Sequence, residues 1–422
     1  MNGILNLSMS KNLIRVFEHQ VLKIGEHGFE EIHFNALVKY NDSHENKYFV
    51  IGHNKIKFKS YVGVIQVKNL TIEILPKADN LPVEESNKNK WQKALLFMLK
   101  ECKLIKVESL SKAFLKIKNS SLLDLYFDAF LSETEKIFNQ GLIKKYKKES
   151  NNTNVIKGKI LFEKNIKNIV HKEKSFCEYQ IYTKDNLFNQ IIFKALNILS
   201  KSTTNNTLLM RAKNISLCFK DISDIDINET SFDKIKFNRN NERYRYSIEL
   251  SKLIILNYSP DLNNGNTNIL AILFDMNRLY EKFIYKRLKK LENENIKVTE
   301  QVIQKFWESK IIKPDILIQL KENDKKQNII IDTKWKVLKE LEPDDSDLKQ
   351  MFVYNLHYNS DLSILLYPKV HFDNQDKKPY HLANSINNNN HYCQIGFVDL
   401  FSSDGNIKQN IEIDIFDTFF KV

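Results

Sequence analysis

The sequence predicts an α+β multi-domain protein with a β-rich N-terminal domain, a mainly helical middle region and a C-terminal α/β domain with a central mixed sheet. Two observations predict this class. Along the chain, the apolar pattern changes from alternation to helical spacing, and then to short aliphatic runs interleaved with helical segments. A chain of 422 residues is also long enough to bury two or three cores. We therefore expect domains over residues 1–80, 81–260 and 261–422.

The composition is typical of a soluble globular protein, with 42% hydrophobic and 27% charged residues. No apolar run reaches the roughly 18 residues that a membrane span requires. The N-terminal stretch MNGILNLSMSKNLIRVFEHQ lacks the apolar core and small-residue cleavage site of a signal peptide. We expect a cytoplasmic protein with no membrane partner.

The formal net charge of +12 predicts a polyanionic partner such as nucleic acid. A bias of the whole chain toward Lys, Asn and Ile explains the same charge without a partner, so both explanations stay open. The four cysteines are scattered and form no Cys-x-x-Cys pair, which argues against a zinc ribbon. Buried reduced thiols are expected instead.

The first domain is predicted from alternating strands within KYFVIGHNKIKFKSYVGVIQVKNLTIEILPKAD, residues 47–79. In its last strand Ile72 and Ile74 lie on one face, and Pro76 ends the strand. The polar stretch DNLPVEESNKNK then separates this domain from the helical region.

The middle region is predicted to be helical, beginning with WQKALLFMLKECKLI, where Trp91, Leu95, Met98 and Leu99 share one face. Helices are expected over 91–105, 120–150, 183–202, 204–219 and 247–256, with a strand pair or turn around Gly158.

A cluster of four lysines is predicted at the C-terminal end of the 120–150 helix, which starts at a serine cap. These are Lys144, Lys145, Lys147 and Lys148. The helix dipole favours cations at this end. The cluster could face an acidic partner or DNA, or it could be a solvated charge run, and both explanations stay open.

The last domain is predicted to alternate strands and helices. Strands are expected over 266–274, 297–306, 316–320, 328–332, 362–368 and 392–400, helices over 275–294 and 345–358, and a polar loop over 385–391.

Two carboxylates and one ammonium lie at the ends of two of these strands. Asp315 opens the 316–320 strand, and Asp332 and Lys334 close the 328–332 strand. Alternation places Asp332 and Lys334 on the same face. If the two strands pair, Asp315 approaches Asp332, and a cation between the carboxylates would relieve their repulsion. Oxygen ligands of this kind suit Mg²⁺ or Mn²⁺. The alternative is an idle ion pair at the surface.

Three further residues are candidates for the same site. Gln350 and Tyr354 are four apart and share a face of the 345–358 helix, while Glu281 lies in the helix before the sheet. A solvated amide, a partly buried ring and a surface carboxylate are the structural alternatives.

These residues resemble a known nuclease core. Pro314–Asp315 and Asp332–Lys334 are similar to the PD-(D/E)XK motif, and QMFVY resembles the Gln-x-x-x-Tyr element of its RecB-like branch. The wider chain resembles the McrC family, the nuclease subunits of McrBC modification-dependent (5-methylcytosine) restriction systems. The segments that carry this resemblance are YVGVIQVKNLTIEILPKAD, VIKGKILF, CEYQIYTKDNLFNQIIFKAL, FDMNRLYEKFIYKRL, KPDILI and IIIDTKWK.

The resemblance implies a PD-(D/E)XK nuclease domain over 261–422 and a motor-interacting region over 81–260. It implies that Asp315, Asp332 and Glu281 bind Mg²⁺ and that Lys334 is catalytic. It also implies two partners: double-stranded DNA, possibly methylated, and a hexameric AAA+ GTPase of the McrB type that the N-terminal half would contact and stimulate. GTP would be used only by that partner, since the chain has no Gly-x-x-x-x-Gly-Lys-Ser/Thr loop.

Three functions are therefore compared. The first is a Mg²⁺-dependent endonuclease subunit of a restriction complex. The second is a stand-alone RecB-like DNA repair exonuclease, against which the long N-terminal half counts. The third is a mainly non-catalytic activator of an AAA+ motor.

Overall fold

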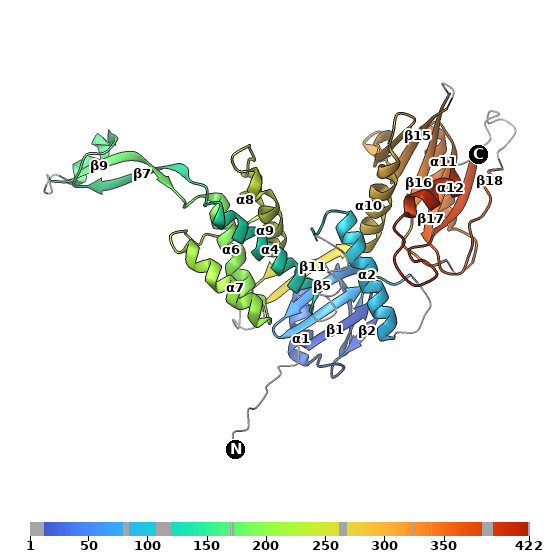
Figure 1. The fold of residues 1–422 in the computed structure, drawn as a ribbon, viewed down its shortest axis with the longest axis horizontal. Helices are drawn as coiled ribbons and strands as arrows, with labels where there is room; N and C mark the ends of the chain where they lie inside the picture. Colours follow the sequence, from blue (N-terminus) through green and yellow to red (C-terminus); the bar gives the residue numbers. More distant parts are fainter. Residues whose placement is uncertain are drawn as a thin grey trace, which may run out of the picture. The chain divides into compact units, whose positions relative to one another are not determined.

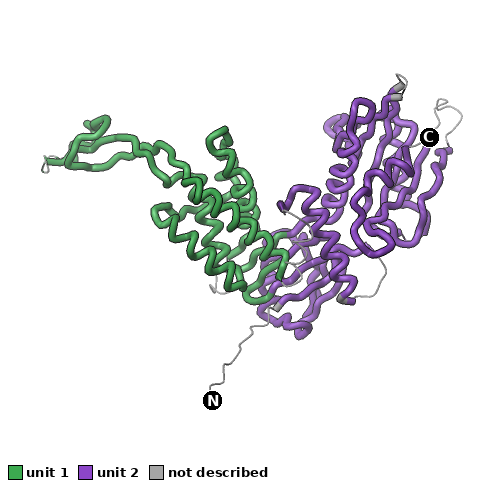
Figure 2. The backbone as a smooth tube through the Cα atoms, in the orientation of Figure 1, with its two compact units in different colours: residues 1–11, 65–70, 120–272 green, residues 12–64, 71–119, 273–422 purple. Residues whose placement is uncertain are grey.

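The structure, a computed structural model, describes residues 12–78, 84–106, 120–168, 170, 173–260, 268–322, 325–338, 340–381 and 391–420 (Figure 1). The chain divides into two compact units (Figure 2). Unit 1 comprises Met1–Lys11, Ile65–Leu70 and Ser120–Ile272, and unit 2 comprises Asn12–Val64, Thr71–Asn119 and Leu273–Val422. The predicted middle region is thus shared between the units, and the domain boundaries at 80 and 260 stay predictions. Among the described helices, none is long and apolar enough to cross a membrane.

Strands dominate the N-terminal part of the chain, as the alternating pattern predicts. The elements are β1 (Asn12–Phe17), β2 (Val21–Lys23), α1 (Glu31–Asp42), β3 (Phe49–Gly52), β4 (Lys55–Phe58), β5 (Tyr61–Val67) and β6 (Leu70–Leu75). One sheet has the order β2-β4-β3, and a second has the order β1-β6-β5-β11-β10. Every residue of β6 is buried, which explains its aliphatic content.

Helix α1 is not predicted from the sequence. Its buried residues His33, Ala36, Leu37 and Tyr40 follow helical spacing, and Glu30 begins the helix with a capping box to His33. The pattern is short, and polar residues surround it. It is therefore weaker than the strand signals on either side.

Helix α2 (Glu85–Glu101) confirms the first helix that is predicted for the middle region. Trp91, Leu95, Met98 and Leu99 are all buried, as their shared face requires. The helix packs in unit 2 against α10 (Met276–Leu288), where the rings of Phe97 and Phe283 lie 5.5 Å apart.

Unit 1 has a helical core that confirms the other predicted helices. Its helices are α4 (Leu122–Asn139), α5 (Phe162–Asn165), α6 (Leu187–Ser202), α7 (Asn206–Ser216), α8 (Glu229–Asp233) and α9 (Arg245–Leu256). Ser121 caps α4 by accepting a hydrogen bond from the backbone of Asp124, so the predicted serine cap is confirmed. Tyr244 joins α6 to the segment before α9, since its hydroxyl donates to Asn189 Oδ1 at 3.1 Å.

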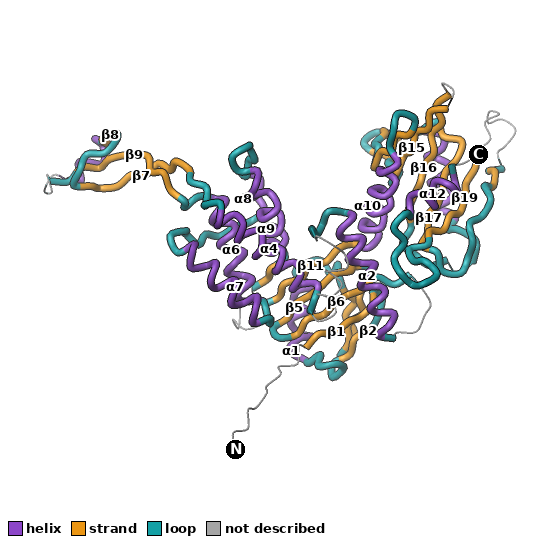
Figure 3. Tube along the Cα trace, in the orientation of Figure 1, coloured by secondary structure: helices purple, strands orange, loops and turns teal. Residues whose placement is uncertain are grey.

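The four lysines predicted to end the 120–150 helix do not lie on a helix. α4 stops at Asn139, because Gly141 adopts a left-handed conformation with φ of 86°. The lysines continue into β7 (Lys145–Thr153), which pairs antiparallel with β9 (Ser175–Thr183). β8 (Lys159–Ile160) completes a sheet of order β7-β9-β8 (Figure 3). The predicted turn is present at Gly158, whose φ is 67°.

The C-terminal part of unit 2 is built on a mixed sheet, as predicted. The strands that follow α9 in the chain are β10 (Tyr258–Ser259), β11 (Ile269–Asp275), β12 (Ile296–Glu300), β13 (Gln304–Trp307), β14 (Lys310–Ile312), β15 (Ile316–Glu322), β16 (Lys325–Thr333), β17 (Ser360–Pro368), β18 (Lys378–Pro379) and β19 (Tyr392–Val398). The sheet order is β12-β15-β16-β17-β19-β18, with parallel pairing only for β16–β17 and β17–β19. The α+β class is confirmed.

Helices α10, α11 and α12 pack against strands of this sheet. Helix α11 (Asp345–His357) buries Met351 and Tyr354 against Ile330 and Leu365. The sheet residue Gly396 is closely approached by Phe419 of α12 (Ile411–Phe419), where a β-carbon would lie 2.5 Å from the ring. The single strand expected over 297–306 is wrong. Gln301 is left-handed, with φ of 49°, and it separates β12 from the small β13–β14 hairpin. The predicted 385–391 loop lies outside the described residues except for His391.

Candidate active site

The candidate site begins at the paired ends of β15 and β16. The two strands pair antiparallel, with Ile316 opposite Ile331. Asp315, just before β15, and Asp332, near the end of β16, therefore reach the same end of the sheet. Strand pairing brings together the carboxylates that the sequence places 17 positions apart.

Asp315 is held across this pair by Thr333. Its Oδ2 accepts hydrogen bonds from the backbone N and from Oγ1 of Thr333, each at 2.8 Å. Burial raises the pKa of Asp315, although the Thr333 hydrogen bonds and the charge of Lys334 oppose that rise. Thr333 faces away from Asp332 and Lys334, and its two hydrogen bonds hold the carboxylate of Asp315 in place.

Asp332 is the most buried acid of the site, with 4% of its surface exposed. Burial and the charge of Asp315 raise the pKa of Asp332 to about 7. Its Oδ2 forms an ion pair with Lys334 Nζ at 2.7 Å. The ammonium opposes the rise in the pKa of Asp332 but does not cancel the effects of burial and of the Asp315 charge.

Lys334 lies between two carboxylates. Besides Asp332, its Nζ contacts Asp347 Oδ1 at 3.2 Å. Burial alone would lower the pKa of Lys334, but the charges of Asp332 and Asp347 outweigh it and raise the pKa. The ammonium is therefore charged at neutral pH, and two acids fix its direction.

Asp347 is a site residue that the sequence does not reveal. It lies in the first turn of α11, and its Oδ2 also contacts Lys336 Nζ at 3.0 Å. Its pKa is lowered, because Lys336 and Lys334 outweigh its burial. An acid in the first turn of a helix is ordinarily explained by the helix dipole, so its sequence position carries no functional signal.

Glu281 approaches the pair from α10. Burial and the charge of Asp315 raise its pKa, which places Asp315 within electrostatic range. Its Oε1 accepts a hydrogen bond from Gln301 Nε2 at 2.7 Å, and Gln301 Oε1 accepts one from Lys313 Nζ at 3.2 Å. Gln301 and Lys313, which were not predicted, thus connect the helix acid to the residues before Asp315.

Gln350 and Tyr354 do share a face of α11, and they contact each other. Gln350 Nε2 donates to the Tyr354 hydroxyl at 2.7 Å, and that hydroxyl donates to the Lys313 carbonyl at 2.9 Å. Burial and the nearby charge of Asp332 raise the pKa of Tyr354 to about 12. The pair therefore supports the backbone beside Asp315, and a direct role in chemistry stays a prediction.

The donor set fits a hard divalent cation. The charge of Asp315 raises the pKa of the buried Asp332, and burial raises the pKa of Asp315. Within the described chain, no three His, Cys, Asp or Glu side chains are gathered closely enough to hold a metal ion, so Glu281 does not complete a three-carboxylate site with Asp315 and Asp332. Mg²⁺ is commonly bound by one or two carboxylates, with water and substrate oxygens as its other ligands.

Trp335, the residue after Lys334, is held by side chains from other parts of unit 2. Trp335 Nε1 donates to Glu18 Oε1 at 2.7 Å, and Lys77 N donates to the same oxygen at 3.0 Å. The Trp335 ring also contacts Tyr280 and Trp91, with centroids 5.0 and 6.1 Å away. This packing fixes the chain that continues from β16.

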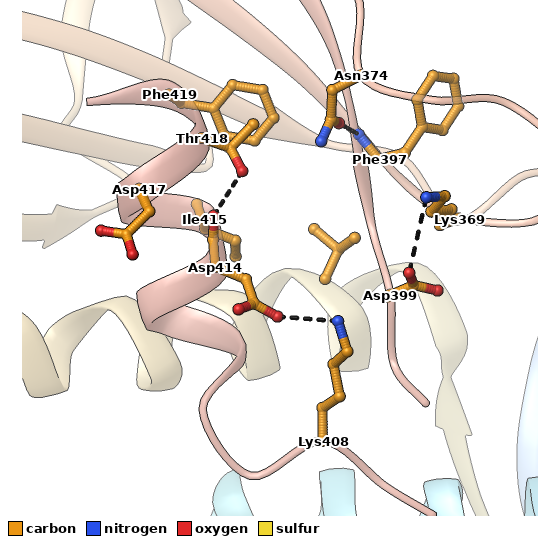
Figure 4. Close-up of a pocket in the computed structure, with 11 residues that line it drawn as sticks. Lys369, Asn374, Phe397, Asp399, Lys408, Asp414, Ile415, Asp417, Thr418 and Phe419 are labelled. Carbon is orange, nitrogen blue, oxygen red and sulfur yellow. Dashed lines mark hydrogen bonds and ion pairs between the residues drawn. The ribbon is translucent and has the colours of Figure 1, made fainter. Parts of the chain in front are cut away.

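A cavity of about 260 Å³ between β19 and α12 is a separate feature (Figure 4). Its charged side chains form ion pairs, with Lys408 Nζ 3.0 Å from Asp414 and Lys369 Nζ 2.8 Å from Asp373. None of the predicted site residues lines it. The cavity therefore offers no competing active site.

Comparison with known proteins gives the family. The model of the McrBC 5-methylcytosine restriction system component family matches residues 56–368. The type IV methyl-directed restriction enzyme EcoKMcrBC of Escherichia coli K12 is 28% identical over 135 residues, which are 31% of this chain and 39% of that protein. The match thus spans about two fifths of the curated relative.

Two solved structures share the fold. One is a half-complex of Thermococcus gammatolerans McrB AAA+ hexamers with bound McrC, with a TM-score of 0.70 and 20% identity over 96% of this chain and 100% of the matched chain. The other is the McrBC complex of the same organism, with a TM-score of 0.51 and 23% identity over 67% of this chain and 88% of that chain. Since the family model covers most of the sequence, the chain belongs to the family of McrBC 5-methylcytosine restriction system components.

Proposed function

We propose that the chain is the Mg²⁺-dependent DNA endonuclease subunit of an McrBC-like restriction complex. The observation that carries this proposal is the pair of buried carboxylates, Asp315 and Asp332, with Lys334 at 2.7 Å, at one end of a mixed sheet in a member of this family. Strongly shifted acids that share a charge partner are typical of functional sites. We assign this domain to the PD-(D/E)XK nucleases on the same residues.

Asp315 and Asp332 would hold Mg²⁺, with Mn²⁺ as a substitute. The ion would acidify a water molecule and neutralise charge on a phosphate oxygen. Lys334, directed by Asp332 and Asp347, would orient the attacking water and stabilise charge that develops on the phosphate. Attack at phosphorus would form one P–O bond and break the bond to O3′, which takes up a proton. The products are a 5′-phosphate and a 3′-hydroxyl.

The substrate that we propose is double-stranded DNA, possibly methylated. The family description names 5-methylcytosine restriction, and the net charge of +12 favours a polyanion. Cleavage is proposed to require an AAA+ GTPase of the McrB type, because the chain itself lacks a phosphate-binding loop.

The surface proposed to contact this motor is the ribbon over residues 145–183, which comprises β7, α5, β8 and β9. It exposes large apolar side chains to an extent unusual for a monomer surface. The exposed side chains are Tyr146, Val155, Ile156, Phe162, Ile166, Val170 and Tyr182. The matched Thermococcus gammatolerans structure is described as McrB AAA+ hexamers with bound McrC, which supports a ring-shaped partner here.

The test combines the full-length chain with its co-encoded GTPase and a methylated duplex. Asp332→Ala should abolish cleavage while it retains stimulation of GTP hydrolysis, and Phe162→Ala should lower the stimulation. Phe138→Ala is the control for the ribbon, since this exposed phenylalanine lies on α4. Cleavage by Asp332→Ala at the wild-type rate would contradict the nuclease assignment. Unchanged GTPase stimulation by Phe162→Ala would contradict the ribbon assignment.

A further inference from the structure

A small hairpin beside the candidate site exposes several large apolar side chains to solvent. Strands β13 and β14 pair antiparallel around a turn at Glu308, and we call residues 303–312 the aromatic hairpin. Ile303, Phe306, Trp307 and Ile311 are each at least half exposed, and Trp307 is 64% exposed. Such a group of large apolar side chains on a two-stranded hairpin usually marks a binding surface.

The aromatic hairpin is fastened to the site at its base. The Tyr358 hydroxyl lies 2.5 Å from the Val302 carbonyl and 3.0 Å from the Ile312 carbonyl, so one side chain of the α11 C-cap spans both strands. On the entry side, Gln301 N donates to the Asp315 carbonyl at 3.0 Å. The hairpin is therefore positioned by the same backbone that carries Asp315.

The charges of this segment match a polyanion. Lys305 and Lys310 lie on the two strands and Lys313 follows them, while Glu308 at the turn is the one acid between residues 303 and 313. Neither Lys305 nor Lys310 forms an ion pair within the described part of the chain. Lysines interleaved with exposed aromatic rings are the pattern by which proteins hold nucleic acid, with cations on phosphates and rings on bases or sugars.

We propose that the aromatic hairpin is a DNA-contacting element that places the scissile phosphate at Asp315, Asp332 and Lys334. Trp307 packs against the sugars of the duplex or wedges between base steps, and Lys305 and Lys310 bind the flanking phosphates. This inference rests on the proposed nuclease function and adds the part of the chain that engages the substrate. Phe306 contacts His357 of α11, with ring centroids 5.5 Å apart, and so supports the hairpin from below.

The tryptophans supply a direct probe. Trp91 and Trp335 are buried, with 3% and 8% of their surfaces exposed, so quenching by acrylamide in the native protein reports chiefly on Trp307. The measurement uses the chain with its GTPase partner in chelator, so that no cleavage occurs, and the same complex with Trp307→Phe gives the background from every other tryptophan. Adding a methylated duplex should reduce the quenching of Trp307 about threefold, because a stacked ring is shielded from solvent.

Variants separate stacking from charge. Trp307→Ala should weaken duplex binding, followed by fluorescence anisotropy, about tenfold. Trp307→Phe should keep binding within about twofold, because the ring is retained. Lys305→Ala should reduce the salt dependence of binding by about one phosphate contact. The matched control is Ile413→Ala, an exposed apolar side chain on α12, which should bind like the wild type.

The outcomes separate this inference from the proposed function. If the wild type binds the duplex but Trp307 stays fully quenchable, the hairpin assignment is wrong while the nuclease proposal stands. If Trp307 is protected by DNA but the metal-loaded complex never cleaves, the nuclease proposal fails and the hairpin assignment stands. Protection that depends on protein concentration and not on DNA would identify a second copy of the chain as the occupant and overturn the inference. Absence of duplex binding would overturn both.

Discussion

Unit 2 contains two buried charge clusters that differ in how their charges are balanced. In the first, Arg287 is 2% exposed and forms ion pairs with Glu101 at 3.1 Å and with Glu412, and Lys290 contacts Glu101 at 2.5 Å. Two cations thus meet two anions. The pKa of Glu101 is lowered, because Lys290 and Arg287 outweigh its burial.

The second cluster, at Asp315 and Asp332, is not balanced in this way. Both acids have raised pKa values, and Lys334, their nearest cation, is shared with Asp347. Burial contributes to the difference, because Asp332 is 4% exposed whereas the side chain of Glu101 is 15% exposed. Folding alone favours a balanced cluster, and buried acids with raised pKa values are typical of functional sites.

The sharpest test of this comparison is catalytic. Asp332→Ala and Lys334→Ala should each lower DNA cleavage about 10³-fold or more if the proposed function holds, because each removes a group that is proposed to act on the reacting phosphate. Cleavage of a methylated duplex by the reconstituted complex measures the effect. Lys336→Ala is the matched control: this lysine also contacts Asp347, but it should keep activity within about threefold, as expected for a partly exposed ion pair. Equal losses of DNA cleavage in Lys334→Ala and Lys336→Ala would mean that Lys334 has no special role among the lysines that contact Asp347.

Removing the central cation of the balanced cluster, Arg287, should lower the free energy of unfolding. Arg287→Met should destabilise the fold by about 3–5 kcal/mol, because two buried carboxylates lose their shared cation. Urea unfolding in chelator measures this. The double variant Arg287→Met, Glu412→Leu should recover part of the loss, since an apolar pair replaces the broken ion pair. No recovery would mean that the cluster is held by something other than charge balance.

Removing a charge from the unbalanced cluster, Asp315 and Asp332, should raise the free energy of unfolding. In chelator at pH 8, Asp332→Asn should stabilise the fold by about 1–3 kcal/mol, because the ionised carboxylate is buried beside another acid. The pKa of Asp332, raised to about 7, means that wild-type stability falls as the pH rises toward that value. The advantage of the variant should therefore vanish near pH 4. Mg²⁺ should stabilise the wild type more than the variant. A variant less stable than the wild type in chelator would show that Asp332 is already compensated.

The smallest effect is expected at Glu18, a buried acid outside the site. Burial raises the pKa of Glu18 to about 7, despite its hydrogen bonds from Trp335 and Lys77, and Asp275 adds to the rise. Wild-type stability should therefore fall between about pH 4.5 and 7, and Glu18→Gln should remove about 1 kcal/mol of that fall. The difference between the two thermal unfolding profiles isolates Glu18 from the neighbouring His19, whose lowered pKa acts in the opposite sense. Parallel profiles would contradict the assignment.

The sequence predicts the carboxylate pair because its determinants are local. Aliphatic runs predict β15 and β16, a short loop predicts their pairing, and the positions of Asp315 and Asp332 at the strand ends follow directly. The same argument fails for Gln301. Its left-handed backbone splits a continuous polar–apolar pattern into β12 and the aromatic hairpin, and no residue type there signals a break.

Other parts of the site depend on contacts that no local pattern contains. Asp347 reaches Lys334 only because α11 packs on the sheet, and the first turn of that helix would be acidic in any case. The lysines after α4 are assigned to the wrong kind of element by the sequence pattern. A charge run at a helix end was predicted, but the glycine that stops α4 decides that they belong to a strand.

The hydrogen bond between Glu18 and Trp335 joins residues that are 317 positions apart. During synthesis the ribosome adds about 5–20 residues each second, so the carboxylate emerges roughly tens of seconds before the indole that binds it. Strand β1, which directly precedes Glu18, pairs with β6 and so has its partner long before Trp335 is made. A nascent chain interrupted before residue 335 therefore keeps the strands of this sheet up to β11 but lacks the hydrogen bond that ties Glu18 to the segment after β16.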